Sequence, residues 1–214
     1  MFVSLGNSMT CYFIKDDFKK QFAVFISYVA YAPIISIPAF AIINYYFLNF
    51  HDFIVITTIC AIFTCILPVL FVLRWIEGKR IHGQEMDMDI PERKDRNYPL
   101  IIVILFYFIG AAVLYTLNAP VMTTILMFSY FLNTLIVFFI NLYWKISIHA
   151  MGVAGPTVVL IYTFGPFGAI FAAIIPIVMW SRVYLKRHTV GQVITGALLG
   201  FILTILQIHF LLIK

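Results

Sequence analysis

Residues 100–142 read LIIVILFYFIGAAVLYTLNAPVMTTILMFSYFLNTLIVFFINL and contain no charged side chain. The stretch divides at Asn118-Ala119-Pro120 into two apolar runs, and each is close to the 20 or so residues that a helix needs to cross a bilayer. The whole chain is 63% hydrophobic and 11% charged, whereas soluble domains carry about 25% charged residues. The sequence therefore predicts an all-α fold, a polytopic transmembrane helical bundle.

Further apolar runs flank this stretch. With 100–117 and 121–142, the runs long enough to span unaided are 22–50, 53–73 and 190–213. The chain is also apolar over 152–180, but Gly165-Pro166-Phe167-Gly168 reads as a turn. The turn leaves two segments of roughly 13 residues, about 20 Å each, for which we expect a short helical hairpin, either thin crossings or a re-entrant loop. The prediction is one integral membrane domain, 1–214, with about six or seven membrane segments.

Positive charge gathers on one side of the predicted membrane. If the N-terminus lies on that side, so do the polar loop 74–98 and the connections 145–151 and 181–188. Thirteen of the fourteen Lys and Arg then share one face, and only Lys214 lies opposite. Since cytoplasmic loops are enriched in Lys and Arg, we expect this face to be cytoplasmic. Membrane topology also explains the net charge of +5, so no nucleic-acid partner is expected.

Three polar clusters border apolar runs on this basic face. They are Arg93-Lys94-Asp95-Arg96, then Lys145-Ile146-Ser147-Ile148-His149, and finally Ser181-Arg182 with His188 and Gln192. They share cations, histidines and hydroxyl donors, and the second and third hold no carboxylate. Guanidinium forks and an ammonium are groups that bind an oxyanion, most plausibly phosphate.

The two histidines can divide a phosphate reaction between them. His188 and Gln192 are four residues apart and share a helix face. Gln192 can accept a hydrogen bond from one imidazole nitrogen and leave the other as a nucleophile. The other histidine, His149, can then protonate the leaving oxygen.

These residues resemble the type 2 phosphatidic acid phosphatase superfamily, which includes lipid phosphatases and vanadium haloperoxidases. Ser181-Arg182, His188 and Gln192 follow the spacing of its third motif, SRxxxxxHxxxD. Ser147-Ile148-His149 is similar to its second motif, PSGH. The first motif, KxxxxxxRP, is matched only in part, by Arg93, Lys94, Arg96 and Pro99. The resemblance covers roughly residues 93–200, within a phosphatase-like core of about 93–213. The chain is still more similar to a divergent bacterial subgroup that has Trp-Lys-x-Ser-x-His instead of PSGH and Gln in the third motif.

The resemblance implies a fold and a set of roles. The interval between His149 and Arg182 suits the family's helical hairpin. His188 would be the nucleophile that forms a phosphohistidine, His149 the acid, and Gln192 the residue that orients His188. The implied phosphate-binding residues are Arg182, Arg96, Lys94, Ser147, Lys145, Arg93 and Ser181. The family mechanism needs no metal and no other cofactor, and the resemblance implies a bacterial inner membrane protein.

The sequence leaves three functions open. The first is a lipid phosphate or pyrophosphate phosphatase acting on an isoprenoid or glycerolipid. The second is a catalytically impaired relative that binds lipid phosphates as a scaffold or transporter, because the neutral Gln192 stands where the family has Asp. The third, less favoured, is a magnesium-dependent prenyltransferase using Glu85, Asp87, Asp89 and Asp95. Expected partners are the lipid phosphate and bilayer lipids, with homo-oligomer formation left open.

Overall fold

The computed structural model describes residues 6–81, 90 and 92–212. These residues form helices and connections without strands, which confirms the all-α prediction. The main helices in chain order are α1 (Gly6–Val29), α2 (Ala32–Phe47), α3 (Phe50–Ala61), α4 (Leu67–Ile81), α5 (Asn97–Thr116), α6 (Val121–Asn141), α7 (Ile148–Phe164), α8 (Pro166–Ala169), α9 (Ile174–Tyr184) and α10 (Val190–Leu212). A π-helical segment, Ile62–Ile66, joins α3 to α4, and a 3-10 turn, Ile170–Ala173, joins α8 to α9.

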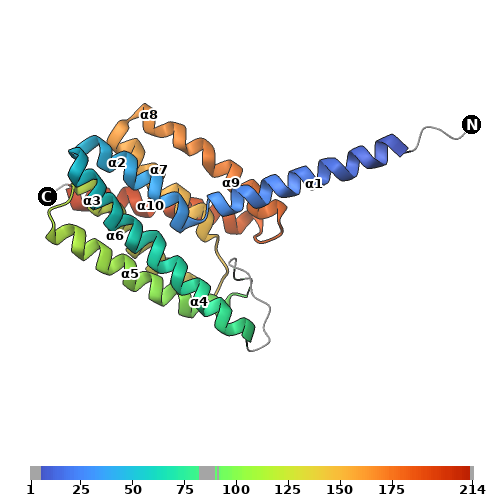
Figure 1. The fold of residues 1–214 in the computed structure, drawn as a ribbon, viewed down its shortest axis with the longest axis horizontal. Helices are drawn as coiled ribbons and strands as arrows, with labels where there is room; N and C mark the ends of the chain where they lie inside the picture. The colour runs from blue at the N-terminus through green and yellow to red at the C-terminus, as the bar shows by residue number, and fades with distance from the viewer. Residues whose placement is uncertain (1–5, 82–89, 91, 213–214) are drawn as a thin grey trace, which may run out of the picture.

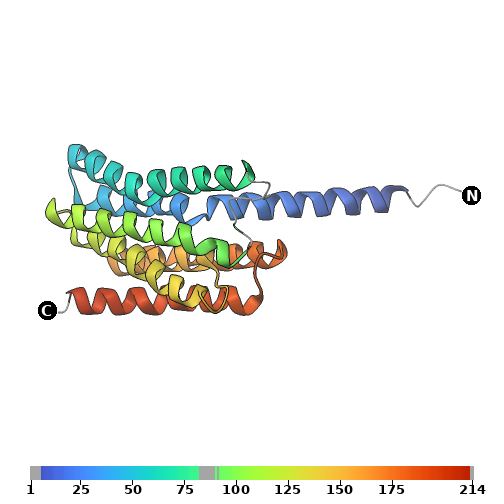
Figure 2. The ribbon, with the colours of Figure 1, turned by 90° about the horizontal axis from the view of Figure 1, so that it is seen from below.

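The helices form a bundle whose long axis runs through both ribbon views (Figures 1 and 2). The start of α1 projects beyond the bundle at one end, and the C-terminal end of α10 lies at the other. We call the end from which α1 projects the motif end, because the connections that hold the three polar clusters lie there.

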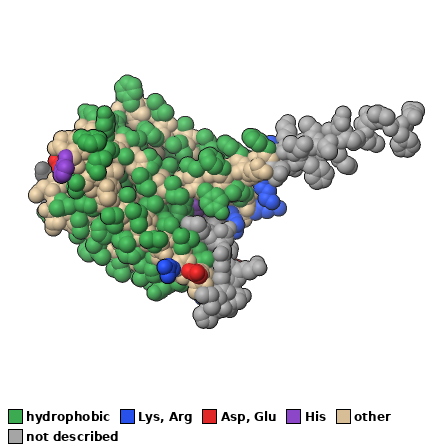
Figure 3. All heavy atoms as spheres, viewed as in Figure 1, with side chains coloured by type: hydrophobic (Ala, Val, Ile, Leu, Met, Phe, Trp, Pro, Cys, Tyr) green, Lys and Arg blue, Asp and Glu red, His purple; other side chains and the backbone are tan. Residues whose placement is uncertain are grey.

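Among the described residues, five helical segments are long and apolar enough to cross a membrane. They are Phe50–Lys79, Lys94–Thr116, Val121–Asn141, Pro166–Tyr184 and Val190–Leu212. The bent pair Phe18–Val29 and Ala32–Phe47 makes a sixth if it counts as one span. In the space-filling view hydrophobic side chains cover most of the displayed face, and its largest group of Lys and Arg lies at the motif end (Figure 3). The chain is an integral membrane protein, as its composition predicts.

The first crossing is broken rather than straight. Its two helices, α1 and α2, meet at an angle of 60°. Pro33, in the first turn of α2, lacks an N–H and clashes sterically with a helical carbonyl four residues earlier, at Val29. Val29 is the last residue of α1, and Tyr31 between the helices has extended backbone angles. Pro33 therefore accounts for the bend, and the bend brings Tyr31 to the motif end.

The predicted hairpin is present, with longer arms than expected. Gly165 has a φ of 60°, in the left-handed region that favours glycine. A Cβ on Gly168 would lie 2.1 Å from the carbonyl oxygen of Leu160, so the turn leaves no room for a side chain there. The two arms, Ile148–Phe164 and Pro166–Tyr184, exceed 13 residues because the second cluster begins the first arm and Ser181-Arg182 belong to the second.

Two glycines let α10 approach α7 closely. A Cβ on Gly196 would lie 2.5 Å from the carbonyl oxygen of Ser147, and one on Gly200 would lie 2.8 Å from that of Met151. A Gly-xxx-Gly spacing permits such close contact between helices. This contact sets the distance between the second and third clusters.

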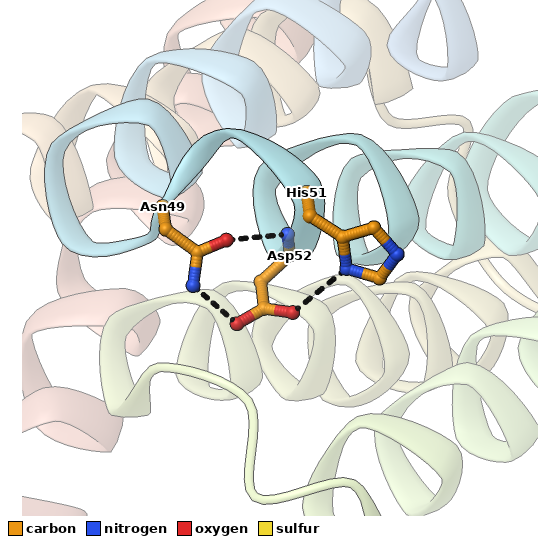
Figure 4. A network of polar contacts seen from close by, with 3 residues as sticks. All are labelled: Asn49, His51 and Asp52. Atoms are coloured by element: carbon orange, nitrogen blue, oxygen red, sulfur yellow. Dashed lines mark hydrogen bonds and ion pairs between the residues drawn. The ribbon is translucent and has the colours of Figure 1, made fainter.

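At the opposite end of the bundle, polar side chains cap the start of α3. Asn49 precedes α3 and accepts a hydrogen bond from the backbone N–H of Asp52 at 3.0 Å. Its amide donates to the Asp52 carboxylate at 2.8 Å, and His51 Nδ1 lies 3.3 Å from the other carboxylate oxygen (Figure 4). An acidic residue in a first turn interacts favourably with the helix dipole. These contacts give Asn49, His51 and Asp52 a structural role at the start of α3.

We expect Gly196→Ala to lower the stability of the protein by about 1–3 kcal/mol, the usual range for overpacking. The new methyl group would meet the backbone of Ser147, which a change of rotamer cannot move away. Gly191→Ala in the first turn of α10 is the matched control, because its nearest neighbour would lie 4.0 Å away. Thermal unfolding in detergent measures both variants, and equal melting temperatures would contradict the assigned contact.

Candidate active site

Each polar cluster contributes a cationic or imidazole side chain to the wall of one cavity at the motif end. Arg96, His149 and His188 are buried, with exposed fractions of 6–8%, and they share the wall of a cavity of about 100 Å³. Arg96 directly precedes α5, His149 lies in the first turn of α7, and His188 lies two residues before α10. Helix N-termini carry partial positive charge, so three such ends favour an anion here.

Hydrogen bonds join the second cluster to the third and attach the first cluster to the end of α6. The backbone N–H of Ser147 donates to the main-chain oxygen of Gln192 at 3.3 Å, which joins the second cluster to the third. Arg93 Nη1 donates to the carbonyl of Asn141 at the end of α6, and Asn141 Nδ2 donates to the carbonyl of Arg93, both at 2.9 Å. The α5–α6 hairpin thus brings the end of α6 back to the first cluster. The second cluster follows directly after α6, so it lies near the first cluster although two spans separate them in sequence.

The end of α9 fixes where His188 lies. Lys186 has a φ of 55°, and the backbone N–H of Arg187 donates to the carbonyl of Arg182 at 3.1 Å. These are the marks of a Schellman motif, in which a left-handed residue ends the helix. The N–H of His188 also reaches the Arg182 carbonyl, at 3.3 Å. The main chain of the third cluster therefore curls back on itself and brings His188 to the start of α10.

Gln192 fixes the tautomer of His188. Its Oε1 accepts a hydrogen bond from the backbone N–H of Thr189 at 3.2 Å and lies 3.1 Å from His188 Nδ1. A backbone amide can only donate, so the shared atom is the carbonyl oxygen, and His188 Nδ1 must be the second donor. Nε2 of the neutral ring then carries the lone pair. The predicted hydrogen bond between these side chains is present.

The same Gln192 belongs to a capping box. Thr189 precedes α10, and its Oγ1 accepts a hydrogen bond from the backbone N–H of Gln192 at 3.4 Å. Gln192 reaches back to the Thr189 N–H, which completes the reciprocal pair typical of Thr-x-x-Gln. Orienting His188 and starting the helix are thus two consequences of one side chain.

The surroundings of His188 keep its ring neutral. Burial, followed by the charges of Arg96 and Arg182, lowers the pKa of His188 from 6.5 to about 3, against an opposing contribution from the Gln192 hydrogen bond. The charge of Lys145 adds to the lowering. A buried imidazole beside two guanidinium groups gains an unfavourable charge on protonation. His188 is therefore unprotonated at neutral pH.

His149 is placed by the start of α7. Ser147 caps this helix, and its Oγ accepts a hydrogen bond from the backbone N–H of Ala150 at 3.4 Å. The ring of His149 lies 5.7 Å from that of Tyr31, centroid to centroid. The side chain of Ser147 thus has a capping role, while His149 faces the cavity that it shares with His188.

Of the cations in the first cluster, Arg96 lies on the wall of the cavity that His149 and His188 share. Its Nε donates to the carbonyl of Ile90 at 2.7 Å, and its side chain lines the cavity. Lys94 is exposed, and Arg93 is directed to the end of α6. The sequence left Arg96 and Lys94 as alternatives for the phosphate clamp, and this arrangement favours Arg96.

Ser181 and Arg182 contact α1. Ser181 Oγ donates to the carbonyl of Ala23 at 2.7 Å. The guanidinium of Arg182 is fully buried and donates through Nη1 to Ser27 Oγ. Within the described part of the chain, Arg182 is not one of the residues on the cavity wall, although its charge acts on His188. Both side chains therefore attach α1 beside the site.

The site includes residues that the motifs did not indicate. Tyr31, Ala32 and Pro33 line the cavity at the bend between α1 and α2, and Pro68 and Val72 line it from α4. Pro33 was the only signal in the sequence for the first group, as a break in an apolar run. Ser27 carried no signal, since its partner is 155 residues away.

The acidic residues proposed for magnesium fall mostly in a part of the chain without described structure. Glu85, Asp87 and Asp89 lie outside the described residues. Asp95 lies with an oxygen 3.9 Å from Lys79 Nζ. No described contact links Asp95 to the cavity, so no observation favours the prenyltransferase hypothesis.

Comparison of the chain with models of protein families, with curated proteins and with solved structures finds no match. The function is therefore argued from the geometry of the site.

The lowered pKa of His188 predicts how stability depends on pH. The unfolded chain binds a proton at His188 near pH 6.5 and the folded chain only near pH 3, so His188 destabilises the fold as pH falls through this range. The slope from one such group is at most about 1.4 kcal/mol per pH unit. We expect His188→Asn to lose less stability than the wild type between pH 7.5 and 5.

Chemical unfolding of both proteins in detergent at several pH values measures this difference. His51→Asn serves as the control, because it removes an exposed histidine at the opposite end of the bundle and leaves His188 and its neighbours in place. Parallel stability curves for wild type and His188→Asn would contradict a neutral His188.

Proposed function

We propose that the protein is a membrane-embedded lipid phosphate phosphatase in which His188 is the nucleophile. The observation that carries the proposal is the hydrogen bond of His188 Nδ1 to the Gln192 carbonyl, which leaves the lone pair on Nε2. The ring is buried and neutral, and it shares a cavity with another histidine and an arginine. An oriented neutral nitrogen beside a fixed cation is suited to attack on a phosphoryl group.

The reaction proceeds in two steps. His188 Nε2 attacks phosphorus, the P–O bond to the lipid breaks, and protonated His149 gives its proton to the leaving oxygen. The product is a phosphohistidine and the lipid alcohol. Water then attacks phosphorus while His149 takes up its proton, the P–N bond breaks, and inorganic phosphate leaves with neutral His188 restored. Each histidine returns to its starting state.

Positive charge at the site stabilises the phosphoryl oxygens. Arg96 lines the cavity and is held by the Ile90 carbonyl, so it needs little reorganisation during reaction. Lys145 lies near enough to influence His188 electrostatically. The start of α7 adds backbone N–H groups and the positive end of its dipole.

The walls of the cavity suggest a lipid substrate. Away from its charged end the cavity is lined by apolar residues from α2, α4 and α5, among them Pro33, Val72 and Val103. Its volume of about 100 Å³ suits a phosphate and the first atoms of the attached chain. The rest of an isoprenoid or acyl chain then lies in the bilayer, which favours a monophosphate or pyrophosphate headgroup over a bulky one.

One observation favours a second function, binding without turnover. Nucleophilic attack places positive charge on the His188 ring, and Gln192 offers a neutral carbonyl rather than a carboxylate. A neutral acceptor is roughly half as strong as a charged one. A scaffold or transporter for lipid phosphate needs the cationic cavity and no such stabilisation.

We expect the purified protein to release phosphate from phosphatidic acid or an isoprenoid pyrophosphate, with inhibition by vanadate. His188→Asn should abolish release. His209→Asn is the matched control, because His209 lies in the last turn of α10 and lines a different, largely apolar groove. Gln192→Glu keeps the side-chain length and adds a charge, and should raise the rate about tenfold.

The assay separates the two functions. If wild type and Gln192→Glu release no phosphate while lipid phosphate raises the melting temperature of wild type and of His188→Asn, the protein binds without catalysis. Phosphate release that survives His188→Asn would rule out the phosphohistidine mechanism.

We also propose that the site faces the cytoplasm, because the Lys and Arg that border the described spans lie at the motif end. The measurement is labelling of single cysteines by a membrane-impermeant thiol reagent on intact cells, in a chain whose native cysteines are replaced. We expect His51→Cys to be labelled from outside and Tyr143→Cys only after permeabilisation. Both positions are exposed, and they lie at opposite ends of the bundle. The reverse pattern would place the site outside.

A further inference from the structure

A smaller cavity lies between α6 and α7, inside the membrane-spanning part of the bundle. Its volume is about 30 Å³. Ser129, Tyr130, Asn133 and Thr134 line it from α6, and Gly152, Gly155 and Pro156 line it from α7. We call it the polar chamber. It shares three wall residues with the larger cavity: Ala32, Thr134 and Ile148.

Two hydroxyl groups of the polar chamber have no hydrogen-bond partner within the described part of the chain. They are Ser129 Oγ and Tyr130 Oη, on side chains that are 1% and 6% exposed. Leaving a buried hydroxyl without a partner costs about 1–3 kcal/mol, so such groups in native proteins are usually satisfied by ordered water.

A backbone carbonyl adds to the polar wall. Pro156 lies inside α7 and has no N–H, so the carbonyl of Gly152 lacks its usual helical donor four residues later. Both residues line the polar chamber. The side chain of neighbouring Asn133 already has hydrogen-bond partners, because its amide group donates to Thr204 and its carbonyl oxygen accepts from Gln207. Hydroxyl donors and a carbonyl acceptor thus surround one small volume.

We infer that the polar chamber is an internal water-binding site that connects with the larger cavity at Thr134 and Ile148. A bound water needs roughly 10–15 Å³ of such volume and two to four polar partners, so the chamber holds about two water molecules. None of its wall residues is charged, which favours water over an ion. The inference stands independently of the proposed function. If the phosphatase proposal holds, these molecules lie next to the turn that carries His149, where hydrolysis consumes water.

The test is X-ray radiolytic labelling of the full chain in detergent, because hydroxyl radicals formed from bound water oxidise the side chains beside it. Met151 and Met127 are both buried, with exposed fractions of 4% and 0%, and both pack against apolar side chains, but only Met151 is among the described residues that line the polar chamber. Both form sulfoxide readily. We expect Met151 to be oxidised several-fold faster than Met127. Equal rates in the wild type would overturn the inference without recourse to any variant.

A double variant, Ser129→Ala with Tyr130→Phe, removes the two hydroxyl groups and nearly preserves shape. Oxidation of Met151 should then fall to the rate of Met127. Tyr107→Phe is the matched control, since Tyr107 is a buried neighbour of Tyr130 that is not on the chamber wall, and it should leave Met151 labelling unchanged. Unchanged labelling in the double variant would overturn the assignment of the water to these hydroxyls.

Discussion

The carbonyl oxygen of Gln192 is shared between the start of α10 and the imidazole of His188. Because Thr189 donates a backbone N–H to it, the oxygen cannot be exchanged with the amide nitrogen, and the proton on His188 is confined to Nδ1. The same oxygen therefore caps the start of α10 and determines the tautomer of His188. A carboxylate in this place would draw the ring toward its protonated form, whereas burial and two guanidinium groups keep it neutral. In the reaction that we propose, the neutral partner suits the resting state of His188 and serves the charged transition state less well.

The attachment of α1 gives the third cluster an additional role. Ser181 and Arg182 match a motif whose resemblance implies phosphate binding, yet their side chains bind Ala23 and Ser27 on α1. Arg182 still acts on the site, because its charge reaches His188 across a buried region where screening by water is weak. A guanidinium held in this way stabilises the tertiary fold and lowers the proton affinity of His188 at once.

Much of the fold follows from the sequence, and the limits have physical causes. Apolar runs predict the spans, and Gly165-Pro166-Phe167-Gly168 predicts the hairpin turn. The hairpin arms were expected too short because Ser181 and Arg182 interrupt the apolar pattern without ending the helix. Spacing alone predicted the contact between His188 and Gln192, although His188 lies two residues before α10 and not on the same helix face as expected. Spacing along the sequence could not indicate Ser27 or Tyr31. These residues lie beside the 60° bend of the first crossing, which sequence spacing does not reveal.

Polar side chains inside the spans fall into two groups, those with hydrogen-bond partners and those without described partners. Asn44 bonds Thr57 and Thr123, and Asn133 bonds Thr204 and Gln207, so these amides hold helices together as polar groups in bilayers usually do. Ser129 and Tyr130 have no such described partners and line the polar chamber. A bundle that needed them only for packing would be more stable with Ala and Phe. Their place on the wall of a chamber that shares Ala32, Thr134 and Ile148 with the cavity of His149 is better explained by the bound water that we infer there.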